Sequence, residues 1–472
     1  AASDVYKRQL QAHWMYRMVY SSQPFQEAFT LFLHDHMPSD FSKISSAMPQ
    51  AVVNGNDGDP GGLLPFGQTQ QCNIGIGGLP YDPTRRETIT VAVLKEQNYL
   101  FRQVGLNRFD DLLLAIVRNP AMLAYLDNYL NVAGRPQENL AREMMELFSM
   151  GVGNYSENDI QQMAKVLTGE TLPNFTCELS WPTDYGFAAV YHEPGSKAVF
   201  SQTIAFSNTG QETVDAVNLV MNKRSVVPNA AALNPPYDTL PAAAIYLSWK
   251  LIQWFADDSV SLDPPSPVVL ELADYLRGSD GAAYPQRRYA YDMKAAMGRL
   301  LRSAYFYDAS RRNILYKNPA DYVAGTFRAF GNLADLFSSE DGSTVWMEKM
   351  GLGLFEPPDV SGWRQGKNWL GSAALINRYN WANYVAHTLL DYPGLVGIID
   401  SMPFTYNDHA GMIAYLGDLL LHTTLSAEDA QMLSDFVASI PVSDLPNNTR
   451  VKRRKVQGLV HVILAMPEAQ LK

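Results

Sequence analysis

The chain has 472 residues, of which 47% are hydrophobic and 18% charged, a globular composition far from that of disordered chains. Its formal net charge of -11 repels phosphate backbones and argues against nucleic acid as a partner. The two cysteines, Cys72 and Cys177, are too few for a disulfide framework or a thiolate zinc cluster, although one bridge between them stays open. No apolar run reaches the roughly 18 residues of a transmembrane helix.

Apolar residues recur at helical spacing through most of the chain, whereas strand-like alternation with β-branched residues is scarce. The expected fold class is therefore mainly α. Helices are predicted, in chain order, over 10–22, 25–35, 86–104, 108–118, 137–150, 157–168, 211–222, 240–256, 266–277, 288–304, 319–330, 344–351, 372–390, 409–422, 427–438 and 451–465. Because no repeat or linker interrupts them, we expect a single large multi-helix domain with helical additions at its C-terminal end.

Two long irregular segments separate these helices. Residues 54–83 contain many Gly and Pro, which predicts a long surface loop. Residues 172–210 are rich in aromatic and turn residues, and a short β-hairpin is expected near 188–204. Loops of this length inside a compact domain are often functional.

His34 and His36 flank Asp35 at the end of the predicted helix 25–35. Residues two apart on an ideal helix point roughly 200° apart, which would separate the two imidazoles. Pro38 disfavours helical geometry at Met37, so a helix that ends near His36 would let both rings converge on a metal ion. The alternative is a pair of helix-end histidines that interact with the terminal carbonyls.

The predicted helix 137–150 has two contrasting faces. Its polar face carries Asn139, Arg142, Glu143 and Glu146. Glu143 and Glu146 lie one turn apart and could share a cation or position a proton, with Arg142 as counter-charge. The alternative is a solvated face held by intrahelical ion pairs.

Other polar segments have mixed interpretations. Ser156 and Asp159 have the spacing of a capping box, which makes Asp159 structural.

His192 and Lys197 lie in a loop, where a histidine suits a ligand or general base, although an exposed turn histidine is the ordinary alternative. The segment 357–363, PPDVSGW, predicts a rigid aromatic corner that supports a site. The basic run over 450–455 is expected at the exposed start of a terminal helix.

Seven short segments of the chain resemble, in sequence and in order, segments of a bacterial family called domain of unknown function 1800. They are QNYLFR (97–102), NPAML (119–123), QENLARE (137–143), ELF (146–148), GV (151–152), LTG (167–169) and PPDVSGW (357–363). The chain resembles this family over about residues 14 to 383. Three positions depart from the family pattern, namely Gln137 in place of Asn, Glu193 in place of Asp, and Glu170 where Trp is common.

The resemblance implies a helical fold, export to the periplasm or the extracellular space, and a protein partner from a sulfatase-like family. Residues 1–9 show no signal peptide, and the chain begins where the family's first helical segment usually ends. We therefore expect an N-terminally truncated family-type domain over 10–395, with a helical extension over 396–472 packed on it.

The resemblance also implies that the His pair, the polar helix face and the His192 loop meet in space. Our leading hypothesis is a metal-dependent hydrolase or oxidoreductase with a polar cleft and a divalent metal ion as cofactor. The expected roles are catalytic for Arg142, Glu143, Glu146 and His192, substrate-binding for Asn139, Lys197 and Trp363, and metal-binding for His34 and His36.

Two rival hypotheses remain at this point. The first is a non-catalytic export or assembly partner in which the same polar residues form a structural network. The second is a carbohydrate-binding protein, since Trp181, Tyr185 and Tyr191 are close together in one irregular segment.

Overall fold

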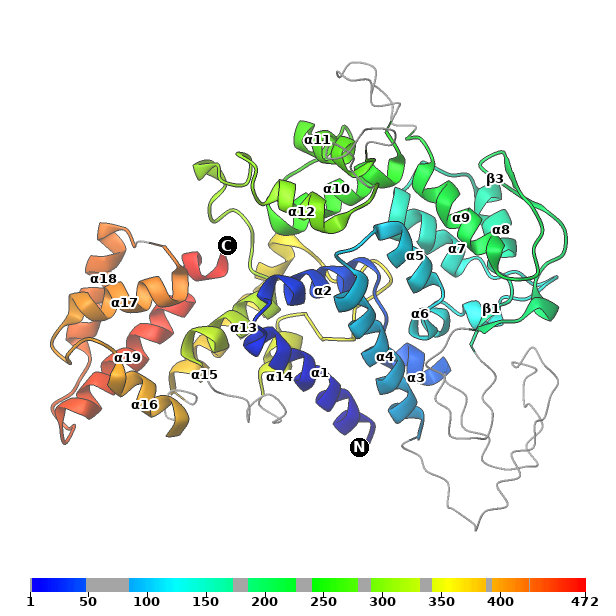
Figure 1. Ribbon diagram of the computed structural model, residues 1–472. Coiled ribbons are helices and arrows are strands. Elements are labelled where there is room, and N and C mark those ends of the chain that lie inside the picture. The colour runs from blue at the N-terminus through cyan, green and yellow to red at the C-terminus, as the bar shows by residue number, and fades with distance from the viewer. Residues whose placement is uncertain are drawn as a thin grey trace, which may run out of the picture. The chain divides into compact units, whose positions relative to one another are not determined.

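Figure 1 shows the computed structural model, which describes residues 2–47, 85–172, 186–225, 240–278, 290–331, 342–387, 393–423 and 425–472. The predicted mainly α fold class is confirmed. The predicted loop over 54–83, Cys72 and Cys177 lie outside the described residues. In the part of the chain that is described, no helix is long and apolar enough to cross a membrane.

The chain forms two compact units. Unit 1 comprises Ala1–Leu10, Phe25–Ala309 and Phe355–Gly362, and unit 2 comprises Gln11–Pro24, Ser310–Leu354 and Trp363–Lys472. These units do not follow the expected division at residue 395, because the helices between residues 319 and 387 group with those that follow them.

The first part of the chain supplies twelve helices and two small sheets in the described residues. The helices are α1 (Ala2–Tyr20), α2 (Pro24–His36), α3 (Phe41–Ala47), α4 (Arg85–Val104), α5 (Phe109–Val117), α6 (Pro120–Tyr125), α7 (Asn139–Met145), α8 (Glu157–Val166), α9 (Gln211–Asn222), α10 (Ala242–Phe255), α11 (Pro267–Leu276) and α12 (Met293–Leu300). The strands are β1 (Glu170–Thr171), β2 (Gly186–Phe187), β3 (Lys197–Val199) and β4 (Gln202–Ile204), paired β1 with β2 and β3 with β4, both antiparallel.

Apolar helix faces build the core of unit 1. In Figure 1, α10, α11 and α12 gather side by side, and α7, α8 and α9 lie together next to β3. Helix α10 is buried along most of its length, and Ala243, Leu247 and Leu251 are fully buried. Because burying one large aliphatic side chain contributes about 1.5–3 kcal/mol, this helix anchors the unit.

The capping box and the β-hairpin predicted from the sequence are both present. The Ser156 side chain accepts a hydrogen bond from the Asp159 backbone, and the Asp159 carboxylate accepts one from Ser156 N at 2.8 Å. Strands β3 and β4 are joined by Phe200 and Ser201, both with positive φ, as in the mirror-image turns that match strand twist. Asp159 also accepts from Phe200 N at 2.7 Å and so fixes the hairpin against α8.

The predicted helix 137–150 changes its geometry in the middle. It is α-helical over Asn139–Met145 and π-helical over Glu146–Met150, which we call the π segment. A wide π turn leaves backbone carbonyls free for other donors, and such turns often occur at functional sites. The change falls between Glu143 and Glu146.

The helices wholly within unit 2 are α13 (Pro319–Phe330), α14 (Ser343–Lys349), α15 (Ser372–His387), α16 (Pro393–Ser401), α17 (His409–Leu421), α18 (Ala427–Ser439) and α19 (Asn448–Ala465). Helix α19 lies against α15, α16, α17 and α18. The basic run over 450–455 was predicted to be exposed, and Arg450 and Arg454 are exposed. Lys452 and Lys455 are buried, and their ammonium groups donate to the backbone carbonyls of Met402 and Tyr406, at 2.8 and 3.1 Å.

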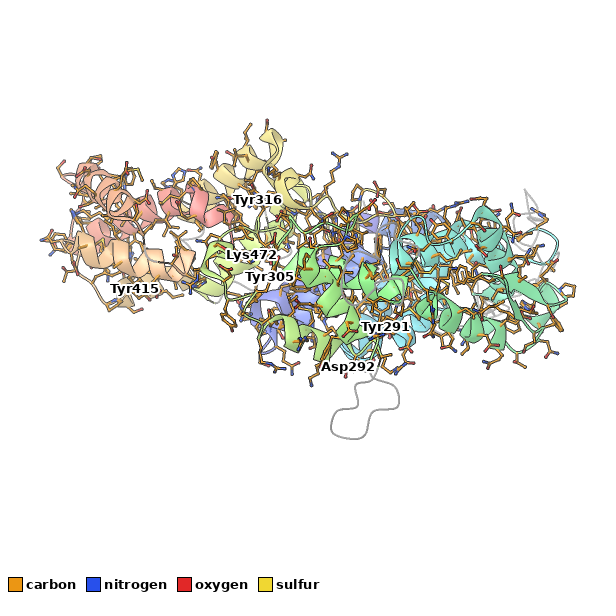
Figure 2. The ribbon with its side chains drawn as sticks, turned by 90° about the horizontal axis from the view of Figure 1, so that it is seen from above. Tyr291, Asp292, Tyr305, Tyr316, Tyr415 and Lys472 are labelled. Atoms are coloured by element: carbon orange, nitrogen blue, oxygen red, sulfur yellow. The ribbon has the colours of Figure 1, made fainter. Side chains whose placement is uncertain are left out.

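The end of α19 leads into a short antiparallel pairing of Lys472 with Leu315, in which Lys472 N donates to Leu315 O at 2.8 Å. Figure 2 labels Lys472 and the neighbouring Tyr316 in this region. The buried Arg378 side chain connects the same region through Gln470 Oε1 at 3.1 Å and Lys317 O at 2.6 Å. These contacts tie the last residues into unit 2.

Candidate functional site

The end of α2 is enclosed by a segment more than 300 residues further along the chain, the turn over 355–362. Phe41 N donates to Phe355 O at 2.8 Å. Gly362 has a φ of +85°, and a Cβ there would lie 2.2 Å from Asp35 O. Only glycine fits so close an approach with this backbone conformation. The predicted rigid corner therefore supports the histidine segment directly.

The two histidines of α2 have separate surroundings. His34 lies edge-on to the rings of Phe101 and Phe355, with centroids 5.3 and 5.0 Å away. His36 stacks on Phe32, and its Nε2 lies 2.9 Å from Phe148 O in the π segment. Helix α2 ends at His36, as predicted, but the two rings lie against different neighbours, and among the described residues no ring contact joins one imidazole to the other.

Both imidazoles are fully enclosed and neutral. Burial lowers the pKa of each to about 3, helped by the charge of Arg102 for His34 and of Lys250 for His36. Among the described residues, no three His, Cys, Asp or Glu side chains lie close enough together to hold a metal ion. The geometry therefore gives no support to a metal bound by His34 and His36 with the glutamates.

Glu143 and Glu146 form a half-buried carboxyl pair at the junction of α7 and the π segment. Tyr155 Oη donates a hydrogen bond to Glu146 Oε2. Burial, and to a smaller extent the negative charge of Glu146, raise the pKa of Glu143 to about 7 against the opposing charge of Arg142. Glu143 therefore exchanges its proton near neutral pH.

Two further tyrosines face these carboxyls. Tyr246 of α10 lies against Gly151, where a Cβ would come within 2.9 Å of its ring. Burial raises the pKa of Tyr246, and the charges of Glu146, Asp35 and Glu143 add to the effect. Tyr125 is buried, and its pKa is raised by burial and then by Asp40, Asp359 and Glu143. Both phenols therefore stay protonated.

Lys250 completes this arrangement. Its ammonium lies 5.7 Å from the Tyr246 ring centroid and 5.3 Å from that of Trp249. Burial lowers the pKa of Lys250, and the charge of Asp35 opposes the shift. We call the whole group the carboxyl–tyrosine cluster, consisting of Asp35, Tyr125, Glu143, Glu146, Tyr155, Tyr246 and Lys250.

The sequence singled out only Glu143 and Glu146 of this cluster as site residues. A signal for Lys250 was present, since it interrupts the apolar run of α10, and a lysine there must either pair or line a polar site. Tyr246 lies one turn before Lys250 on the same helix. No local pattern marks Tyr246, because its partners come from α2 and α7.

Arg142 and Asn139 lie at the surface of α7. Arg142 pairs with Glu138 at 3.2 Å and with Glu157 at 2.6 Å, both at the surface. The hydrogen bond with Glu157 raises the pKa of Arg142. Asn139 is exposed at the first turn of α7. The solvated-face interpretation therefore describes Arg142, although not the glutamates.

His192 and Lys197 form a second group with Glu212, which we call the ion cluster. Lys197 Nζ lies 2.8 Å from Glu212 Oε2, and His192 Nε2 lies 2.9 Å from Glu212 Oε1. All three side chains are buried, so the expected exposed turn histidine is not observed. Burial opposes ionisation of Glu212, but hydrogen bonds with His192 and Lys197 hold its pKa below the usual value.

The ion cluster satisfies its polar atoms internally. His192 Nδ1 donates to Thr168 O at 2.7 Å, because a carbonyl can only accept. Lys197 Nζ donates to Glu193 O at 2.5 Å. Among the described residues, no hydrogen bond, ion pair or ring contact joins this cluster to Glu143 or Glu146. These contacts are typical of a structural network.

The remaining predicted site residues fall elsewhere. Trp363 is buried and belongs to unit 2, where its carbonyl accepts from Gln365 Nε2 at 3.1 Å. Trp181 and Tyr185 lie outside the described residues, and Tyr191 lies in a short 3-10 turn before His192.

The profile of one family, described as "Protein of unknown function (DUF1800)", matches residues 84–471. The match continues past residue 395, where the family-type domain was expected to end. Neither a curated protein nor a solved structure matches the chain. The profile covers most of the chain, including every residue of the carboxyl–tyrosine cluster except Asp35. The chain therefore belongs to the DUF1800 family.

Proposed function

We propose that this protein is a hydrolase in which Glu143 and Glu146 form the acid–base pair. The observation that carries the proposal is the pKa of about 7 for Glu143, raised by burial and by the neighbouring Glu146. General acid–base catalysis is most efficient when the pKa of the catalytic group lies near the working pH. Two carboxyls whose environments differ in this way commonly divide the acid and base roles.

The environment of each carboxyl indicates its role. Glu146 accepts a hydrogen bond from Tyr155, which stabilises its negative charge, so Glu146 is the base that takes a proton from an attacking water. Glu143 holds a proton up to neutral pH and donates it to the leaving group. Solvent then returns the proton from Glu146 to Glu143, so the net reaction consumes one water.

The proposal is tested by screening wild type and Glu143→Gln on chromogenic glycosides, carboxylic esters, phosphate esters and peptides. Gln keeps the size of the side chain but cannot donate a carboxyl proton. We expect wild type to hydrolyse at least one substrate class, and we expect the variant to hydrolyse that class at a rate lower by about 100-fold or more. Glu138→Gln, a change at the surface at the N-cap of the same helix, is the matched control and should retain the rate. Equal rates for wild type and Glu143→Gln would contradict the proposal.

Stability gives a second readout of Glu143 that requires no substrate. Its folded pKa of about 7 lies above the unfolded value, so the folded state binds the extra proton between about pH 4.5 and 7. Glu143 therefore stabilises the folded wild type below that window, and this stabilisation is lost as the pH rises through it. The Gln side chain of Glu143→Gln does not titrate, so the variant does not lose stability in this way. We expect the free energy of unfolding of Glu143→Gln, relative to wild type, to increase from pH 4.5 to pH 8 in urea titrations, and a constant difference would contradict the assignment.

The structural-network hypothesis fits a different part of the molecule. The internally satisfied ion cluster supports a structural role for His192 and Lys197. Export and a sulfatase-like protein partner are proposals that rest on the family resemblance alone. Cell fractionation and co-purification with the native protein test them, and retention in the cytoplasm would contradict the first.

A further inference from the structure

The connection between α16 and α17, residues 402–408, is fastened to α19 by two lysines of the basic run. Lys452 is the first of them, and its Nζ donates to the backbone carbonyls of Asp400 and Met402, at 3.1 and 2.8 Å. All three helices belong to unit 2, and α19 packs against both α16 and α17. The connection therefore depends on buried ammonium groups for its position on α19.

Lys455 is the second lysine, and one of its partners can titrate. Its Nζ donates to Tyr406 O at 3.1 Å and lies 2.7 Å from Nε2 of His409, in the first turn of α17. Lysine ordinarily keeps its proton about four pH units higher than histidine, so the proton between them belongs to Lys455. An ammonium can only donate, and His409 Nε2 is therefore the unprotonated acceptor. The contact requires a neutral imidazole.

The charges around His409 favour that neutral form. Burial, and to a smaller extent the charge of Lys455, lower the pKa of His409 against the opposing charge of Asp408. The two acidic groups of this region have other partners, since Asp408 caps α17 and Asp400 of α16 pairs with Arg453 of α19. Helices α13 and α18 also pack on α17, but among the described residues no charged group of either bonds to His409 or shifts its pKa.

Protonation of His409 would reverse the sign of this contact. It removes the lone pair that accepts from Lys455 and places a second positive charge 2.7 Å from the ammonium, so attraction becomes repulsion. His409 is partly exposed, whereas Lys455 is buried. The imidazole is therefore the group that turns into solvent, while the ammonium keeps Tyr406 O as its acceptor.

We propose that Lys455 and His409 form an acid-sensitive latch, which holds the first turn of α17 on α19 at neutral pH and releases it on acidification. A histidine whose folded pKa lies below the unfolded value binds fewer protons in the folded state. Its stabilisation is therefore present at neutral pH and is lost as the pH falls through the folded pKa. The latch lies in unit 2, outside the carboxyl–tyrosine cluster, and does not rest on the proposed function.

The latch is tested by hydrogen exchange of the full chain, followed by mass spectrometry at pH 7.5 and pH 5.0 and corrected for the intrinsic effect of pH. His409→Gln keeps an acceptor for Lys455 but does not titrate. Lys455→Met keeps the aliphatic stem and removes the cation. His422→Asn is the matched control, because His422 is an exposed histidine at the other end of α17, with a positive φ that Asn tolerates.

We expect the protection of peptides covering 402–412 to fall about threefold or more between pH 7.5 and pH 5.0 in wild type and in His422→Asn, but not in His409→Gln. Imidazole NMR gives a second readout, with the His409 signal identified by its absence in His409→Gln. This signal should titrate at a higher pH in Lys455→Met than in wild type, because the repelling charge is gone.

Two results would overturn the proposal. One is an equal loss of protection in wild type and His409→Gln, and the other is the same titration of His409 with and without the Lys455 cation. If Lys455→Met does not fold, the exchange comparison of wild type with His409→Gln decides, because that change replaces only a partly exposed side chain.

Discussion

Glu212→Ala is expected to destabilise unit 1 by about 3–5 kcal/mol, because it leaves the buried Lys197 ammonium without its counter-charge. The carboxylate of Glu212 also accepts from Ser207 N at 2.7 Å, so the same change leaves a backbone donor unsatisfied. The measurement is urea unfolding followed by circular dichroism at neutral pH. Asp215→Ala, a surface change one turn along the same helix, should shift the free energy of unfolding by no more than about 0.5 kcal/mol.

A double variant distinguishes a lost charge partner from lost packing. Removing both charges, with Lys197→Met added to Glu212→Met, leaves no ion buried alone and should recover part of the stability lost by Glu212→Met. If Glu212→Met is as stable as wild type, the ion cluster is not a structural network. If the double variant is less stable than either single one, packing rather than charge dominates.

The sequence predicted well those elements whose signals are local. Helices α9 and α13 have the bounds expected from apolar periodicity and flanking residues, and the hairpin near 188–204 is present. Helices α3 and α6 were not predicted, because seven and six residues are too few to show a helical period. The π segment was missed as well, since its sequence continues the periodic pattern of α7 and only the backbone widens.

The candidate site was predicted only in part, for a different physical reason. Glu143 and Glu146 were found because their spacing puts them on one helix face. Tyr246 faces them from α10, a helix about 100 residues further on, and no pattern within α10 identifies its partners. The buried surroundings of His192 could not be predicted from its loop either, since they are set by Glu212 of α9. Tertiary pairing decides which polar residues remain available for chemistry.

Arg102→Met is expected to cost about 3–5 kcal/mol of stability, because Arg102 and Glu27 form a buried, bidentate ion pair between α4 and α2. Arg102 Nε lies 2.9 Å from Glu27 Oε1, and Nη2 lies 2.8 Å from Oε2. The Arg102 carbonyl also accepts from Gln26 Nε2 at 2.9 Å, which aligns the two helices. This pairing holds α2, and with it His36 and Asp35, against the rest of unit 1.

The loss should depend on pH in a defined direction. Without Arg102, the buried Glu27 carboxyl is expected to take up a proton on folding, so the folded variant binds more protons than its unfolded chain. Its stability then falls as the pH rises, and the difference from wild type is larger at pH 7 than at pH 5 in urea unfolding. Arg108→Met removes an exposed ion pair with Asp110 and should cost at most about 1 kcal/mol. If the double variant Glu27→Leu/Arg102→Met is more stable than Arg102→Met, the unpaired Glu27 charge causes the loss. If the loss in Arg102→Met is the same at pH 5 and pH 7, lost packing causes it instead.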